Sequence, residues 1–482
     1  MKAIKYLVMG VMLAGFSATA NAQEAELNAA LEGIKSQAPN VAELAKTAYK
    51  KNKKDAEALV KIGRAFLEQK DTANAALFAN YANEAGKPKY QYAPAYLLLG
   101  DIEASYGTDG GKAAGFYNQA INFDPTNPEG YKKWAMVYRK ISPTQAAKKL
   151  EEMEQKCPNE DANAMIGHIY MLSYNVSKSS KDEKAAYEAY KKADINKLDK
   201  TGLNEFARAS FFQGHFDDAL TACQTGLKLD PRNPTFNRLA MFASYELKNY
   251  DAAKEYIHKY FYETDSAKVS EYDHFYTALI YQALEDKPNM YAHYDKALEL
   301  VNDQSMKKRW DILKTVSDSY LNDKDFEKSL KYYQDMLACK PEVKFDDEEG
   351  LAKIYSKYAE EVPEKASDLI NKAVEIFVNA GVKFPIQEVY SNYMAAATIF
   401  KLDKNMEKGL AKPYYQKVID LVTSKSDRSK AENTMLITSY NYMMYSALQG
   451  KKADVPTAKS YADKILEIDP EFASALKIKA LK

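Results

Sequence analysis

The feature that most constrains this chain is a small residue that is followed, again and again, by another small residue twelve positions later. Two antiparallel helices joined by a short turn approach closely only where side chains are small, so each occurrence predicts a helical hairpin. The pairs at this spacing are Gly63/Ala75, Ala135/Ala147, Ala207/Ala219, Ala240/Ala252, Ala278/Met290 and Ser317/Ser329, in which Met290 is the one large member. Gly100/Ala113 and Gly167/Ala186 repeat the pairing with loop insertions, which are predicted at 107–111 and 173–184.

Aromatic residues and prolines hold fixed positions relative to these small residues. The second helix of several predicted hairpins carries an aromatic residue four positions after its small residue, as at Tyr117, Tyr190 and Tyr294. Spacings of three and four place side chains on one helix face. Several hairpins then end before a proline, such as Pro125 or Pro231, because proline cannot continue a helix.

Taken together, small-x2-aromatic, small-x3-aromatic and a closing proline resemble the tetratricopeptide repeat, a unit of about 34 residues. The register residues of the second helices stand at 75, 113, 147, 186, 219, 252, 290, 329, 366, 411 and 458. The intervals between them are 38, 34, 39, 33, 33, 38, 39, 37, 45 and 47 residues. The resemblance implies an all-α fold, a right-handed superhelix (α-solenoid) of about eleven helix-turn-helix repeats.

The regularity of the repeat divides the chain into three parts. Residues 1–22 form a predicted signal peptide, residues 23–380 the tetratricopeptide array, and residues 381–482 a C-terminal region of less regular helical repeats. The last region is set apart because its intervals lengthen. The acidic run 346–349 also breaks the apolar rhythm, and it is interpreted either as a turn between repeats or as a mild boundary. A second candidate boundary lies at 379–385.

The N-terminus predicts export. Lys2 and Lys5 precede an apolar stretch at 6–16, and Ala20-Asn21-Ala22 forms a small-residue cleavage motif before Gln23. The first cysteine, Cys157, lies far beyond this motif and is not placed to carry a lipid. No later segment offers the roughly 18 apolar residues that a transmembrane helix requires. We therefore expect a periplasmic protein, with secretion as the alternative.

The charge balance argues against a nucleic-acid partner, and the positions of the cysteines predict free thiols. Lys plus Arg and Asp plus Glu both number 67, and removal of Lys2 and Lys5 leaves 65 basic against 67 acidic residues. Such a balance provides no basic surface for nucleic acid. The three cysteines, Cys157, Cys223 and Cys339, lie in different predicted repeats, too far apart to be bridged. We expect three free, mostly buried thiols.

No constellation of residues predicts catalysis. No pair of the five histidines has the helical spacing with glutamate that builds a metal site. The glycine-rich segment 107–111 lacks the Gly-Lys-Ser/Thr ending of a phosphate-binding loop, and no Gly-x-Ser-x-Gly elbow is present. The sequence thus predicts a protein that is not an enzyme and uses neither a cofactor nor a metal.

A concave inner surface is what the resemblance implies for binding. In tetratricopeptide superhelices, the residues three before and one after the small residue of each first helix face inward. These positions are Lys132, Met136, Ala164, His168, Asn204, Arg208, Asn237, Met241, Phe275 and Leu279. Lysine, arginine and asparagine suit a carboxylate or an extended backbone, while methionine and phenylalanine form adaptable apolar pockets. The alternative is an inner face that is only solvated. Arg208 stands where the carboxylate clamp of chaperone-binding repeats has asparagine, so that ligand is not supported.

The predicted function is a non-catalytic scaffold of the cell envelope that binds a protein or peptide partner, as part of an outer-membrane or envelope complex. One alternative is an outer-membrane-associated glycan-binding protein on a tetratricopeptide-like fold. That group typically carries a lipid anchor and tryptophan-rich loops, whereas this chain has two tryptophans. Another alternative, an α/α-toroid enzyme, needs longer helix pairs than the repeat interval of about 34 residues provides.

Overall fold

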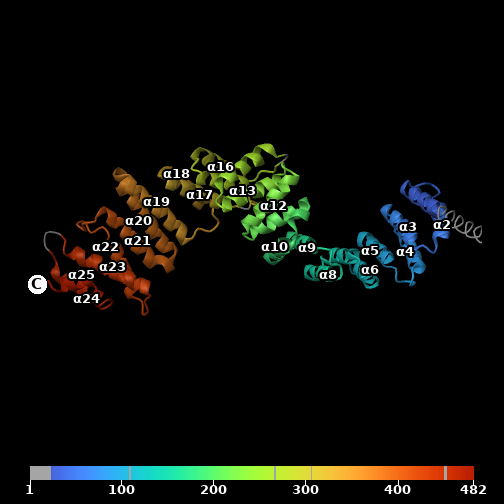
Figure 1. Ribbon diagram of the computed structural model, residues 1–482. Helices are drawn as coiled ribbons and strands as arrows, with labels where there is room; N and C mark the ends of the chain where they lie inside the picture. Colours follow the sequence, from blue (N-terminus) through green and yellow to red (C-terminus); the bar gives the residue numbers. More distant parts are fainter. Residues whose placement is uncertain (1–22, 108–109, 265–266, 306, 450–452, 482) are drawn as a thin grey trace, which may run out of the picture. The chain divides into compact units, whose positions relative to one another are not determined.

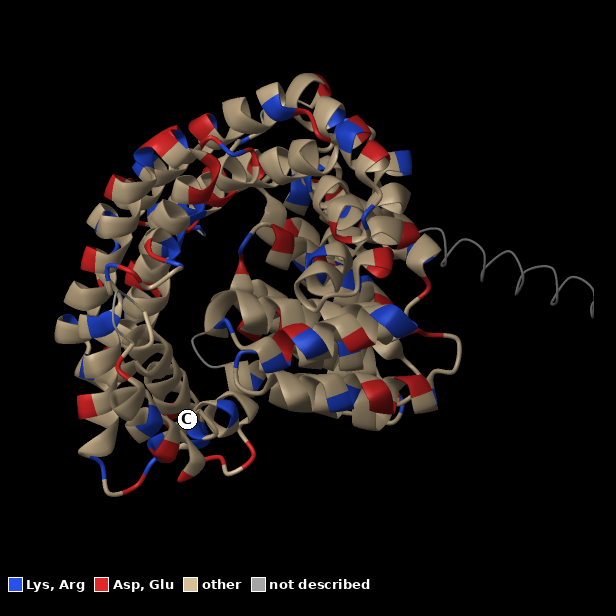
Figure 2. Ribbon diagram, turned by 90° about the vertical axis from the view of Figure 1, so that its left-hand side faces the viewer, with Lys and Arg blue, Asp and Glu red and all other residues tan. Residues whose placement is uncertain are grey.

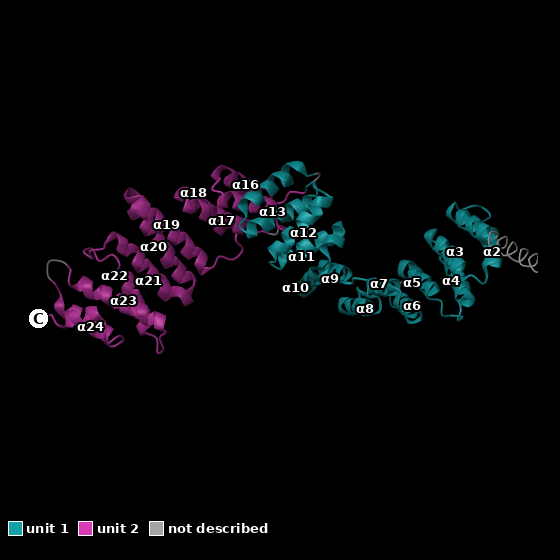
Figure 3. Cartoon of the chain, viewed as in Figure 1, with its two compact units in different colours: residues 1–267 teal, residues 268–482 magenta. Residues whose placement is uncertain are grey.

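The chain folds into two compact units of paired helices. The computed structural model describes residues 23–107, 110–264, 267–305, 307–449 and 453–481. Contacts within the chain separate unit 1, up to residue 267, from unit 2, which begins at residue 268 (Figure 3). Every regular element in these described ranges is a helix (Figure 1). The predicted signal peptide lies outside the described residues.

The helices of unit 1 follow a helical segment at 23–35. They are α2 (Val41–Asn52), α3 (Ala56–Glu68), α4 (Thr72–Ala85), α5 (Ala93–Tyr106), α6 (Gly110–Phe123), α7 (Pro128–Tyr138), α8 (Pro143–Lys156), α9 (Asn163–Ser177), α10 (Ser180–Lys192), η1 (Ile195–Lys197), α11 (Lys200–Phe212), α12 (Phe216–Leu229), α13 (Pro234–Glu246), α14 (Tyr250–His258) and η2 (Lys259–Glu263).

Unit 2 continues with the same alternation. Its helices are α15 (Glu271–Ala283), α16 (Lys287–Leu300), α17 (Arg309–Asn322), α18 (Phe326–Cys339), α19 (Phe345–Glu361), η3 (Pro363–Lys365), α20 (Ala366–Lys383), η4 (Pro385–Gln387), α21 (Glu388–Ile399), η5 (Phe400–Leu402), α22 (Lys412–Thr423), α23 (Lys430–Ala447), α24 (Val455–Leu466) and α25 (Ala473–Lys479).

Consecutive helices pack as pairs, each made of a first helix with an odd number and a second helix with the next even number. Unit 1 holds the six pairs from α3/α4 to α13/α14, and unit 2 holds the five pairs from α15/α16 to α23/α24. The all-α helical repeat and the predicted number of about eleven hairpins are thus confirmed. The predicted boundary at residue 380 falls inside α20, and helix pairs continue on both sides of it.

One compact turn joins the two helices in five of the pairs. In α3/α4, Lys70 adopts the left-handed conformation with φ 66°, and the amide of Asp71 donates to Phe66 O at 2.9 Å. This bond is the Schellman ending of a helix. The Asp71 side chain then accepts from Asn74 N at 3.0 Å and caps α4. The same backbone turn recurs at Gly214-His215, Lys248-Asn249, Glu285-Asp286 and Lys324-Asp325, with a side-chain cap at all but His215.

The small residues predicted at the helix crossings are needed because large side chains lie directly against them. A Cβ atom at Gly100 would lie 2.6 Å from Tyr117 Cδ1, and one at Gly167 would lie 2.6 Å from Tyr190 Cδ2. Both tyrosines are almost fully buried. In these two hairpins the aromatic residue of the second helix therefore fills the space beside the glycine. This packing explains why an aromatic residue stands four positions after the small residue of the second helix.

The register residue of α14 was assigned one position too early, and that of α8 one position too late, because the fourth residue of α8 is Ala146. At the α13/α14 crossing the fully buried small residue is Ala253, whereas Ala252 is half-buried. Because α14 begins directly after its N-cap Asn249, its fourth residue, the position that Ala219 holds in α12, is Ala253. The interval to the preceding register residue is therefore one residue longer than predicted.

The loop predicted at 173–184 is wrong. α9 extends to Ser177 and α10 begins at Ser180, so that only two residues connect them. The hydroxyls of Ser173 and Ser177 donate to Asp182 Oδ2 at 2.7 and 3.0 Å, which ties the end of one helix to the start of the next. Serine is as compatible with a helix terminus as with a loop, and composition alone did not distinguish the two.

The three cysteines are free, as predicted. Cys157 and Cys223 are buried, whereas Cys339 is exposed at the end of α18. In the ribbon of Figure 2, positions of Lys and Arg are interspersed with those of Asp and Glu along the helices. Among the described helices, none is long and apolar enough to cross a membrane.

Candidate binding groove

Six of the predicted inner-face residues lie on consecutive first helices of unit 1, and all six are half-buried. They are Lys132 and Met136 on α7, Ala164 and His168 on α9, and Asn204 and Arg208 on α11. Lys132 Nζ pairs with Glu160 at 2.8 Å. The structure therefore leaves these side chains partly accessible on α7, α9 and α11, and their role in binding remains a prediction.

His168 is held by a buried carboxylate that the sequence analysis did not identify. Its Nδ1 lies 2.9 Å from Glu205 Oε2, and the Tyr190 hydroxyl donates to the same oxygen at 2.5 Å. The hydrogen bond to Glu205 raises the pKa of His168, and burial opposes it. Burial also raises the pKa of Tyr190, so the phenol remains a donor. Glu205 directly follows Asn204, and its place on the buried side of α11 is the signal that could have revealed it.

Three of the four remaining predicted residues are buried. Asn237 and Met241 are fully buried in α13, and Phe275 of unit 2 is only 5% exposed. The Asn237 amide donates to Pro231 O and Asn233 O, both at 3.1 Å, and so closes the turn before its own helix. Leu279 is half-buried. The expectation that Asn237, Met241 and Phe275 line an open groove is therefore corrected.

A groove is present in unit 2, over three first helices that the sequence analysis had not singled out. Its volume is about 540 Å³. The lining residues are Lys314, Asp318 and Leu321 from α17; Tyr333 from α18; Asp346, Gly350, Lys353, Ile354, Ser356, Lys357 and Glu360 from α19; Phe377 from α20; and Met394, Ala397, Thr398 and Lys401 from the α21 region. The longest contribution comes from α19, where spacings of three and four keep these residues on one face.

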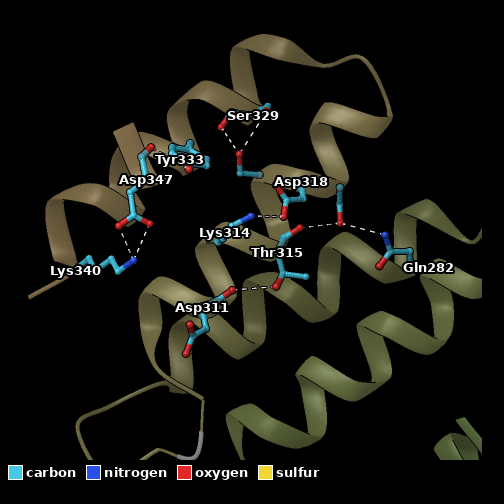
Figure 4. A network of polar contacts seen from close by, with 11 residues as sticks. Gln282, Asp311, Lys314, Thr315, Asp318, Ser329, Tyr333, Lys340 and Asp347 are labelled. Carbon is cyan, nitrogen blue, oxygen red and sulfur yellow. Dashed lines mark hydrogen bonds and ion pairs between the residues drawn. The ribbon is translucent and has the colours of Figure 1, made fainter. Parts of the chain in front are cut away.

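The floor of the groove depends on the absence of a side chain at Gly350. A Cβ atom there would overlap the Tyr333 hydroxyl oxygen, and Tyr333 Cζ would follow at 2.8 Å. The ring can therefore reach across α19, where its hydroxyl donates to Asp347 O at 3.1 Å (Figure 4). Ile354 and Phe377 are also buried. These three side chains form an apolar floor below charged walls.

The acidic run at 346–349 is the first turn of α19, and neither interpretation from the sequence had placed it there. Asp347 accepts from Lys344 N at 2.8 Å and pairs with Lys340 Nζ at 2.7 Å (Figure 4). Carboxylates at this end of a helix are stabilised by the backbone dipoles. The run therefore begins a helix, and it leaves Asp346 at the mouth of the groove.

Ion pairs brace the walls. Lys314 pairs with Asp318 at 2.8 Å on α17 (Figure 4). Lys401 bridges α21 and α19 by reaching Glu360 at 2.7 Å and Ser356 Oγ at 2.8 Å. Lys353 pairs with Glu349 at 2.8 Å. Most of the charges in the walls are thus paired, which leaves a surface that is polar at the rim without being strongly charged.

Part of the groove could have been found from the sequence. Lys314 stands three residues before the small residue Ser317 and Asp318 one residue after it, which are the two inner-face positions of the repeat. Ser317 packs at the crossing as expected, where its hydroxyl donates to Ser329 O at 2.8 Å (Figure 4). The contributions of α19 and α21 had no such signal, because their hairpins lack a pair of small residues twelve apart.

The described residues hold no cluster of three histidine, cysteine or acidic side chains that could bind a metal ion. Paired helices with small crossing residues and aromatic packing define the class: an all-α helical-repeat protein whose repeat resembles the tetratricopeptide unit. A scan against protein-family models found no match, and no curated protein is similar in sequence.

The solved structures that this chain partly resembles include the following three. The C-terminal part of a TPR repeat-containing protein from Cytophaga hutchinsonii is 20% identical, with a TM-score of 0.43 over 58% of this chain and 100% of that one. A tetratricopeptide repeat protein from Parabacteroides merdae is 15% identical, with a TM-score of 0.32 over 52% and 94%. A protective antigen of uropathogenic Escherichia coli with an SLR fold is 14% identical, with a TM-score of 0.41 over 90% and 92%.

Proposed function

We propose that this chain is a non-catalytic scaffold that binds an extended segment of a partner protein in the groove of unit 2. The observation that carries the proposal is the trough of about 540 Å³ along α19, with an apolar floor and a polar rim. Ligand sites of this size usually combine an apolar lining with a few polar groups that fix the orientation. An extended peptide presents both apolar side chains and backbone hydrogen-bonding groups to such a surface.

The side chains of the groove favour binding over chemistry. Neither histidine nor cysteine is among its lining residues, and the hydroxyl of Ser356 is engaged by Lys401 at 2.8 Å. A nucleophile needs a neighbouring base to be activated, and a lysine ammonium group is not one. The residues of the walls therefore suit binding of a peptide without a chemical reaction.

We also propose that the protein acts in the periplasm, within an assembly of the cell envelope. The support is the basic and apolar pattern at 1–22, with the cleavage motif Ala20-Asn21-Ala22. Sequencing of the mature N-terminus checks this step. A terminus near Gln23 supports it, and retention of Met1 contradicts it.

Filling of the groove tests the binding function. Ala397 is half-buried in the lining, so Ala397→Trp should occupy the trough while leaving the core intact. Ala338 is exposed on α18 outside the groove, and Ala338→Trp is the matched control. Envelope extract is passed over each protein, and the retained proteins are identified by mass spectrometry. The proposal expects a partner that the wild type and Ala338→Trp retain and Ala397→Trp loses. A partner retained equally by all three places binding elsewhere.

A further inference from the structure

The groove of unit 2 is electrically asymmetric along α19. Asp318 and Asp346 lie towards the end where the helix begins. Burial raises the pKa of Tyr333, and the carboxylate of Asp347, followed by those of Asp318, Glu348 and Asp346, raises it further. Towards the other end, Lys353, Lys357 and Lys401 line the walls with Glu360 as the one acidic residue.

Two charged side chains of the groove differ from the others because they form no ion pair with a described residue. Lys353 and Lys401 are paired with Glu349 and Glu360, and Lys314 is paired with Asp318. By contrast, neither Asp346 nor Lys357 forms an ion pair with any described residue, and both are exposed. An exposed charge next to an apolar floor is available to a ligand that carries the opposite charge.

The separation of these two charges sets a length for the ligand. Asp346 and Lys357 are eleven positions apart on one continuous helix. At a rise of about 1.5 Å per residue, that spacing corresponds to roughly 16 Å. An extended peptide advances about 3.3 Å per residue, so about five residues cover the same distance. Between the two ends lies the floor of Tyr333, Ile354 and Phe377.

We infer that the groove binds an extended peptide segment along α19, with a basic residue at Asp346, an acidic residue at Lys357 about five positions away, and an apolar side chain over the floor between them. This inference rests on the proposed peptide-binding function and adds the chemistry of the segment. The opposite charges fix its orientation, and the apolar side chain provides the buried area.

A displayed library of random peptides tests the inference on the full mature chain. Wild-type protein should enrich peptides with one basic and one acidic residue about five positions apart and an apolar residue between them. Lys357→Glu makes both ends acidic, so it should enrich peptides that are basic at both ends. Lys477→Glu, an exposed lysine of α25 outside the groove, makes the same charge change and should select the wild-type pattern.

Synthetic peptides of the two patterns then give the size of the effect by fluorescence anisotropy at low ionic strength. Exposed charge pairs contribute little, so each mismatched end should weaken binding by roughly 1.5-fold to fivefold. The inference is overturned if no charge pattern is enriched, or if Lys357→Glu selects the same peptides as the wild type. The proposed function fails separately: a partner that Ala397→Trp still retains contradicts groove binding, whatever the library selects.

Discussion

The contact between Gly350 and Tyr333 offers the sharpest test of how the groove is built. In a helix interior, alanine is favoured over glycine by about 1 kcal/mol, because glycine loses more backbone entropy on folding. At residue 350 this gain is opposed by the overlap of a Cβ atom with the Tyr333 hydroxyl oxygen. Overpacking costs about 1–3 kcal/mol. We therefore expect Gly350→Ala to destabilise the packing of α18 on α19 by about 1 kcal/mol.

Removal of the hydroxyl should relieve most, but not all, of this overlap. Tyr333→Phe alone loses the hydrogen bond to Asp347 O, which is worth about 1 kcal/mol. In the double variant the overlapping oxygen is gone, but the ring carbon Cζ still lies 2.8 Å from the added Cβ atom and must shift slightly. Simple addition of the two single losses would give about 2 kcal/mol; the double variant should lose about 1 kcal/mol, which corresponds to a coupling energy of about 1 kcal/mol.

Native-state hydrogen exchange at the amides of α18 and α19 is the suitable assay, because a long repeat array opens locally and does not unfold as one two-state unit. Exchange in α23 and α24, which do not contribute to this contact, serves as the internal reference. A double variant that loses the sum of the single effects would refute the reasoning. So would a Gly350→Ala protein that is more stable than the wild type by the full helix gain.

Three further predictions follow from buried groups. Ala219→Leu should lower the free energy of urea unfolding by about 1–3 kcal/mol, because Ala219 is fully buried at its helix crossing. Arg208 is half-buried and forms no ion pair with a described residue, so Arg208→Ala should change that free energy by no more than about 0.5 kcal/mol. A larger loss for Arg208→Ala than for Ala219→Leu would contradict the assigned helix phase. Burial lowers the pKa of His274 and of His293 to about 4, and their Nδ1 atoms are 2.9 Å apart. Because the unfolded chain binds protons first, the stability of α15/α16 in native-state hydrogen exchange should fall between pH 7 and pH 5 by up to about 2 kcal/mol for each histidine, less what solvent screening removes, and His274→Gln should reduce that slope. In native protein only the exposed Cys339 should react rapidly with a thiol reagent, while unreduced, denatured protein should show all three thiols.

The sequence predicted the repeat well because its signals are steric. A glycine such as Gly100 must be small to admit Tyr117, and this requirement appears in the sequence as a fixed spacing. The turns were harder to predict, because the left-handed residue is usually glycine but is lysine at Lys70, Lys248 and Lys324. Their conformation is imposed by the Schellman hydrogen bonds and not by the residue type.

The candidate site was predicted only in part. Lys314 and Asp318 hold the expected inner-face phase, but Gly350 lies on a helix whose crossing follows no twelve-residue rule. Its importance comes from a contact with Tyr333 of the preceding hairpin, and a pattern within one hairpin cannot reveal such a contact. Asn237, Met241 and Phe275 were wrongly predicted to be accessible on the inner face, because they are buried. The position of a residue in a helix predicts the direction of its side chain, but it does not predict which other residues cover that side chain.

The turn at Lys70-Asp71 also bears on how such an array changes length in evolution. In these turns one residue both completes the ending of the first helix and begins the second, so that an insertion would separate two sets of hydrogen bonds at once. In the connections from a second helix to the next first helix at 230–233 and at 86–92, which span four and seven residues, no single residue has both roles. Insertions and deletions among homologues of this chain should therefore occur mainly at those connections. An inserted epitope tag should also be tolerated better there than in the turns within a helix pair.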